Sequence, residues 1–189
     1  MRAHCTLFAL ALLAGCASTP PALQPARTNL DEFLLAGRFA LRAHKPDGSP
    51  ESLSGRLHWQ HQNTEDRITL ANPLGQGMAE IVVRPDQARL TLADGRQQVA
   101  DNAAQLIEQL TGQRLPMTRL PDWLTGRMAP SSRLQRDTHG RPSRLNEAGW
   151  QVDYSYDDDR PDAPASRLII SDGGYTELRV RIETWTYQP

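Results

Sequence analysis

The chain has 189 residues and a formal net charge of −1, from 21 basic and 22 acidic side chains. It has no basic excess to neutralise phosphates, which argues against a nucleic-acid partner. Once the N-terminal segments described below are set aside, about 160 residues remain, enough for one domain with a sizeable core.

The N-terminus has the three parts of a secretory signal: a positive Arg2, an apolar run from Leu7 to Ala14, and small residues before Cys16. Eight apolar residues are too few to cross a bilayer, which takes about 20 in a helix. The ending Leu-Ala-Gly-Cys at 13–16 resembles the lipobox of bacterial lipoproteins. We therefore expect residues 1–15 to be removed and Cys16 to be lipidated. The alternative is an ordinary signal peptide followed by a chance cysteine.

Cysteine content agrees with a lipid anchor. Cys5 leaves with the signal, so the mature chain keeps only Cys16 and can form no internal disulfide. Residues 16–28 are small, polar and proline-rich, as in a semi-extended tether. Ala17 and Ser18 stand where an aspartate would favour retention at the inner membrane in enteric-type sorting. We expect an outer-membrane location, facing the periplasm.

Residues 29–189 are assigned to one domain. A short helix is expected near Asn29–Leu35, and the chain then alternates apolar and polar residues with period two. Turns such as Asp94-Gly95 and Gly173-Gly174 between these segments are typical of an antiparallel meander. The expected strands cover Gly37–His44, Leu53–Gln60, the stretches around Ile68, Leu90 and Val99, Met78–Arg84, Arg133–Asp137, Arg144–Glu147, Trp150–Tyr156, Arg167–Ser171 and Tyr175–Thr184.

The segment from Asp101 to Thr111 departs from this period. Its apolar residues recur at helical spacing, with Asp101 as the expected N-cap and Gly112 as the stop. A further short helix is expected over Thr118–Leu124. Helices inserted into a strongly curved sheet would cover its concave face. The predicted fold is therefore mainly β: an incomplete antiparallel barrel of about eleven strands, with a few helices covering a concave apolar cavity.

No catalytic motif is present. The sequence has no Gly-x-Ser-x-Gly elbow, His-Glu-x-x-His pair or phosphate-binding glycine loop. The mature histidines, including His58 and His61, are expected on polar strand faces or turns. The acidic run at 157–159 is interrupted by Arg160 and does not match a calcium loop, so a solvated hairpin is favoured. We expect no catalytic residue, no metal and no cofactor.

The loop at 71–77 is unusual because it places a large apolar residue at the tip of a turn. Pro73, Leu74 and Gly75 follow Asn72, and Asn-Pro and Gly are turn residues. The position of the Leu74 side chain can be interpreted in two ways. It folds back onto the sheet, or it serves as a hydrophobic probe that touches a membrane or an acyl chain.

In the order and spacing of its motifs, the chain resembles the LolB family of outer-membrane lipoprotein receptors from Cys16 to near Trp185. The resemblance rests on Gly37-Arg38-Phe39-Ala40, Leu57-His58-Trp59-Gln60, Leu70-Ala71-Asn72-Pro73-Leu74-Gly75, Leu110-Thr111-Gly112, Pro116, Trp123-Leu124-Thr125-Gly126 and Ser171-Asp172-Gly173-Gly174. The stretch Gln76-Gly77-Met78 departs from the pattern in being more flexible than expected.

The resemblance implies a function without catalysis. Such proteins accept outer-membrane lipoproteins from the soluble periplasmic carrier LolA and insert them into the inner leaflet of the outer membrane. They hold the acyl chains in an apolar cavity of a half-open barrel. The expected partners are therefore LolA, the lipoprotein cargo and the membrane. The protein itself is expected to be a monomer.

We expect the acyl-chain cavity to be lined by apolar residues of the sheet and of the covering helices. Ordinary core is the alternative for each, because period-two patterning does not separate a filled core from a lipid cavity. The expected lining residues are Phe39, Leu41, Leu57, Trp59, Ile68, Leu70 and Ile81 from the strands, and Leu106, Ile107, Leu110, Trp123 and Leu124 from the helices.

Two other classes of function stay open from the sequence. One is a structural or assembly lipoprotein that binds an envelope protein by its sheet edge. The other is an envelope enzyme acting on lipid or glycan. A polar cleft with paired carboxylates would favour the enzyme, whereas a cavity without convergent polar groups would favour lipid transfer.

Overall fold

The computed structural model describes residues 32–44, 47–112, 115–174 and 176–186. The expected signal peptide, Cys16 and the tether at 16–28 lie outside this range. Eleven strands form one sheet in the order β6-β5-β4-β3-β2-β1-β11-β10-β9-β8-β7. Their bounds are β1 Glu32–His44, β2 Pro50–Gln62, β3 Glu65–Ala71, β4 Gly77–Arg84, β5 Gln87–Leu92, β6 Gln97–Ala100, β7 Arg133–Arg136, β8 Pro142–Glu147, β9 Trp150–Ser155, β10 Arg167–Ser171 and β11 Thr176–Thr186.

The centre of the sheet consists of the three longest strands. β1 pairs with β2 along its whole length and with β11 on its other side, both antiparallel. The odd-numbered residues of β1 from Phe33 to Ala43 are buried, while the intervening residues are partly or fully exposed. This continuous period of two places every apolar odd position on one face.

The prediction of a helix near Asn29–Leu35 is wrong for residues 32–35, the part of this range that the structure describes. Residues 32–35 belong to β1, where Phe33 and Leu35 are buried and Leu34 is only partly buried. The two adjacent leucines suggest a helical stripe when read alone. In the structure, pairing with β2 and β11 on both sides fixes them as a strand.

Two glycines allow the central strands to come close together. A Cβ atom at Gly37 would lie 2.1 Å from the carbonyl oxygen of Arg181, and one at Gly55 would lie 2.1 Å from that of Ala71. The β1–β11 register also shifts between Ala36 and Gly37. Bulges and glycines of this kind bend a sheet, and here they lie where its two arms meet.

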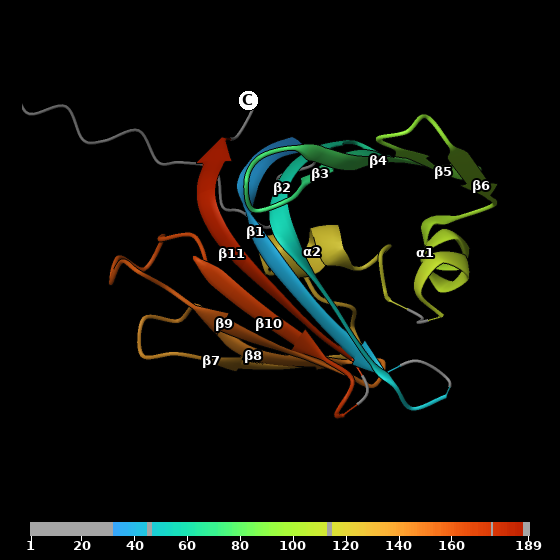
Figure 1. The fold of residues 1–189 in the computed structure, drawn as a ribbon. Coiled ribbons are helices and arrows are strands. Elements are labelled where there is room, and N and C mark those ends of the chain that lie inside the picture. Colours follow the sequence, from blue (N-terminus) through green and yellow to red (C-terminus); the bar gives the residue numbers. More distant parts are fainter. Residues whose placement is uncertain (1–31, 45–46, 113–114, 175, 187–189) are drawn as a thin grey trace, which may run out of the picture.

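Figure 1 shows the two arms, β3–β6 and β7–β10, joined by β1, β2 and β11. Helix α2 (Leu120–Thr125) lies between the arms, and α1 (Ala103–Thr111) lies beside β5 and β6. In the described part of the chain the sheet runs from β6 to β7 without closing into a barrel. The predicted fold class, an incomplete antiparallel barrel with helices over its concave face, is confirmed.

The helix boundaries follow local capping signals, with one correction. Asn102, and not Asp101, is the N-cap of α1: its backbone is extended and its side-chain oxygen accepts a hydrogen bond from the N–H of Gln105. Gly112 ends the helix with a φ of 68°, as expected. Asp101 instead donates a hydrogen bond from its own N–H to the side-chain oxygen of Gln105.

Candidate functional site

The concave face carries the apolar residues that the sequence assigned to a cavity, and they form one buried cluster. From the sheet, the buried members are Phe39, Leu41, Leu57, Trp59, Ile68 and Ile81; from the helices, they are Leu106, Ile107, Trp123 and Leu124. The same cluster extends across the second arm through residues such as Leu168 and Ile170. A single apolar surface therefore covers the inside of both arms.

Two expected lining residues differ from the others. Leu70, next to the register shift at the end of β3, is only partly buried and packs against the edge of the cluster. Leu110 lies in α1, but its side chain is outside the described part of the structure.

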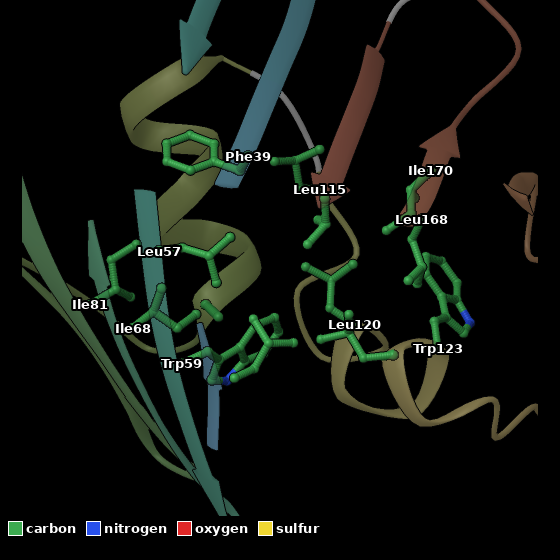
Figure 2. Packing of buried hydrophobic residues seen from close by; sticks show 14 of the residues in the cluster. Phe39, Leu57, Trp59, Ile68, Ile81, Leu115, Leu120, Trp123, Leu168 and Ile170 are labelled. Carbon is green, nitrogen blue, oxygen red and sulfur yellow. The ribbon is translucent and has the colours of Figure 1, made fainter. Parts of the chain in front are cut away.

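Helices α1 and α2, with Leu115 from the segment between them, fill much of the space between the arms with their side chains. Figure 2 shows Trp59 on one side, Leu168 and Ile170 on the other, and Leu115 and Leu120 between them. Trp123 of α2 and Leu106 of α1 are completely buried. In the described residues, protein side chains therefore pack against one another between the arms.

An open pocket of about 370 Å³ remains at one end of the concave face. Its floor contains Trp59, Ile68 and Val83 from the sheet, and Met117 and Pro121 from the segment around α2. Of the residues that the sequence assigned to the cavity, only Trp59 and Ile68 line this pocket. Its rim is polar and includes His61, Asn63, Thr64, Asp66, Arg84, Asn102, Thr118, Asp122 and Arg127.

His61 corrects the expectation that the histidines occupy polar faces or turns. β2 extends to Gln62, so His61 shares the concave face with Leu57 and Trp59 and is only 7% exposed. Its ring stacks on Phe33 at 5.0 Å between centroids. His58, three residues earlier, is exposed on the opposite face, as the period of two predicts. Among the described residues, no group of three or more metal-ligating side chains lies close together.

Helix α2 is fastened to the β7–β10 arm by polar bonds. Arg119 Nε lies 2.5 Å from Glu147 Oε1 and the same guanidinium pairs with Asp122. Glu147 Oε2 accepts hydrogen bonds from Ser132 Oγ and the N–H of Ala129. Burial opposes ionisation of Glu147, but the hydrogen bonds from Arg119, Ser132 and Ala129 outweigh it and lower its pKa to about 2.

The Tyr154 hydroxyl adds a bond from β9 by donating to the carbonyl of Trp123 at 3.0 Å. Together these contacts fix α2 to the arm on which Glu147 and Tyr154 lie.

The loop between β3 and β4 holds Leu74 in solvent. The Leu74 side chain is 88% exposed, which excludes the interpretation in which it folds back onto the sheet. Asn72 makes the turn rigid: its Oδ1 accepts from the N–H of Leu74 and of Gln76, and its carbonyl accepts from the N–H of Gly75. Gly75 has a φ of 89°, which an L side chain rarely adopts.

Sequence reasoning missed two groups of residues at this site. It omitted the second arm, including Leu145, Val152, Leu168 and Ile170, although their strands alternate as clearly as those of the first. It also missed the polar rim of the pocket. No sequence signal connects His61 with Asp122 and Arg127, which lie about sixty residues further along the chain.

Comparison with known proteins gives consistent matches over nearly the whole chain. The family described as "Outer membrane lipoprotein LolB" matches residues 31–185. An outer-membrane lipoprotein LolB from Dechloromonas aromatica (strain RCB) is 51% identical over 183 residues, covering 97% of this chain and 96% of that protein. One from Bordetella petrii is 40% identical over 171 residues and covers 85% of each.

Among solved structures, the LolA superfamily protein NE2245 from Nitrosomonas europaea has a TM-score of 0.48 and 12% identity, covering 87% of this chain and 90% of that one. None of the helices in the described residues is long and apolar enough to span a membrane.

Proposed function

The chain belongs to the LolB family of outer-membrane lipoproteins, and from this we propose that it accepts lipoproteins from the periplasmic carrier LolA and inserts them into the inner leaflet of the outer membrane. The acyl chains of the cargo are held in the apolar interior, and no covalent chemistry is involved. The relatives' names support the outer-membrane location. In this proposal Cys16 carries the lipid anchor, and the tether lets the domain reach into the periplasm.

The observation that carries the proposal is the single apolar cluster across the concave face of an unclosed sheet. An acyl chain of about 15 methylenes gains roughly 12 kcal/mol by leaving water, so it cannot cross the periplasm exposed. A concave sheet lined by leucine, isoleucine and aromatic side chains provides the required surface. We assign the lining to the residues predicted from the sequence, including Leu70 and Leu110.

The packed interior gives a reason why binding is reversible. For an acyl chain to enter, helix side chains such as Leu106 must leave their places on the sheet. The chain then replaces contacts that the protein already makes, so its net affinity is lower than its full transfer energy. Transfer needs no energy source if the receptor binds the chains better than the carrier does and the bilayer binds them better still.

Leu74 is assigned to the release step. Its exposed position on a rigid turn lets it reach lipid without unfolding any part of the sheet. Burial of one leucine contributes about 1.5–3 kcal/mol, which biases a step but does not anchor a protein.

A two-stage transfer assay tests the proposal. Cargo lipoprotein bound to LolA is first mixed with this protein, and the loaded protein is then mixed with outer-membrane vesicles. The proposal requires cargo to move at both stages without nucleotide or metal. If cargo stays on the carrier while the protein instead captures an envelope protein by its sheet edge, the assembly role replaces the transfer role.

A further inference from the structure

The open pocket at the end of the concave face combines an apolar floor with a polar rim, and this combination indicates which part of a lipid it receives. The floor contains Trp59 and Ile68, which also belong to the buried cluster of the interior. The pocket therefore adjoins the buried cluster at these two residues. The rim is then the place where the polar end of a bound lipid stays.

The charges on the rim are balanced. Arg84 and Arg127 are opposed by Asp66 and Asp122, and Arg127 Nε lies 2.9 Å from Asp122 Oδ1. Arg84 Nε is also bonded to Glu65 at 3.0 Å. A phosphate headgroup would meet two carboxylates at this rim and find both arginines already in ion pairs. Because the positive and negative charges of the rim are already paired, the rim favours binding of an uncharged group that carries hydrogen-bond donors and acceptors.

Asp66 determines which ring nitrogen of His61 is available to such a group. Asp66 Oδ1 accepts from Trp59 Nε1 and lies 2.7 Å from His61 Nδ1. A carboxylate only accepts, so Nδ1–H donates to Asp66 and Nε2 is the ring nitrogen left for a ligand. Nε2 has no hydrogen-bond partner among the described residues, and His61 lines the pocket. The rim therefore presents two groups that can hydrogen-bond a ligand, Nε2 of His61 and the hydroxyl of Thr118.

We propose that this pocket binds the polar junction of the cargo lipid, the amide and ester groups that join the acyl chains to its N-terminal cysteine. The amide group hydrogen-bonds to His61 Nε2, and ester carbonyls accept from rim donors such as Thr118. The acyl chains pass over Trp59 and Ile68 into the interior. This inference rests on the proposed function and adds how the receptor distinguishes a lipoprotein from a bare hydrocarbon chain.

Two variants of the full chain and two probes test the proposal. The probes are a synthetic triacylated cysteine lipopeptide, which has the junction, and a pyrene-labelled hexadecane, which has chain only. His61→Phe removes Nε2 and keeps an aromatic ring beside Phe33. Thr118→Val removes one exposed hydroxyl without changing the shape of the side chain. Thr69→Val, at an exposed site on β3 outside this pocket, is the matched control.

His61→Phe and Thr118→Val are expected to weaken lipopeptide binding by about three- to tenfold, the usual effect of one lost hydrogen bond, and not to weaken hexadecane binding. Thr69→Val should change neither. Unchanged lipopeptide binding in Thr118→Val and in folded His61→Phe would overturn the proposal, as would an equal loss for both probes. Tighter binding of phosphatidylglycerol than of the lipopeptide would make the pocket a phosphate site instead. Failure of the wild-type protein to take cargo from LolA would contradict the proposed function itself.

Discussion

At Leu74, a few hydrogen bonds decide whether an apolar side chain is core or surface. The side chain of Asn72 bonds the N–H groups of both Leu74 and Gln76, so the turn holds its shape without help from the leucine. Replacing an exposed leucine on such a turn should therefore leave the stability of the fold unchanged. Any effect of replacing Leu74 should instead appear in the interaction of this loop with another molecule.

Leu74→Asp is therefore expected to leave the unfolding temperature unchanged and to keep uptake from LolA. It removes about 1.5–3 kcal/mol of apolar burial at the membrane and adds a charge that lipid disfavours, so delivery to vesicles should fall at least tenfold. Leu74→Phe should keep most delivery. The two-stage transfer assay separates the steps.

The control is Val99→Asp, which places the same charge on another exposed apolar residue, 50% exposed on β6. It should not affect delivery. Equal loss at uptake and delivery in Leu74→Asp would place Leu74 in the cargo site and contradict its role at the membrane.

Close strand contacts give a second expectation for single residues. A Cβ atom at Gly55 would overlap the carbonyl oxygen of Ala71, whereas one at Gly77 would have no atom within 4 Å. Gly55→Ala should lower the free energy of unfolding by about 1–3 kcal/mol, the usual cost of overpacking, and Gly77→Ala should not lower it. Urea denaturation of both variants checks the difference. A similar loss in both would mean that backbone flexibility, and not the close contact, is what the glycines provide.

Among the elements, the two helices are attached to the sheet in different ways. Helix α2 is tied to the β7–β10 arm by Arg119, Glu147 and Tyr154. Helix α1 contacts β5 and β6 at the other end of the sheet and buries Ala103, Leu106 and Ile107 there. Each arm thus carries its own helix.

The bond between α2 and the sheet makes stability depend on pH. The pKa of Glu147 is about 2 in the folded protein against an ordinary value of 4.5, and its side chain is only 4% exposed. A lowered pKa stabilises the fold above pH 4.5, and this stabilisation is lost as the pH falls towards 2. Between about pH 6 and pH 3 the loss due to Glu147 should reach about 2 kcal/mol.

Urea unfolding at these two pH values checks this expectation. In Glu147→Gln the protein should be less stable at pH 6, and the difference from wild type should shrink at pH 3. If the difference stays constant with pH, ionised Glu147 does not hold α2 in place.

For the whole molecule, location and cargo binding are expected to reside in separate parts. Cys16 and the tether precede the described domain, whereas the apolar cluster lies entirely within it. A form that starts after Cys16 should therefore fold and take lipoprotein from LolA at a rate close to that of the lipidated protein. Gel filtration of the mixture, followed by detection of cargo in each fraction, checks this. A folded form that leaves all cargo on LolA would place part of the binding site in the anchor.

The sequence by itself determined the strands and the face that each one buries. Period-two alternation is a local property, so Phe39, Leu41 and Ala43 of β1 and the residues Leu57 and Trp59 of β2 could be assigned without coordinates. The spacing of Leu106 and Ile107 and the stop at Gly112 likewise predicted α1. The unusual loop tip at Leu74 was also visible, because an apolar residue among turn residues departs from the local pattern.

Only the tertiary structure decided how these faces meet. Burial of Phe33 and Leu35 in a strand required partners on both sides of β1, and the predicted helix failed there because pairing overrides local preference. The exposure of Leu74 depended on side-chain bonds from Asn72. The pocket rim depended on contact between segments far apart in the chain. Such contacts are set by the curvature of the sheet, which arises from all its strands together and not from any one segment.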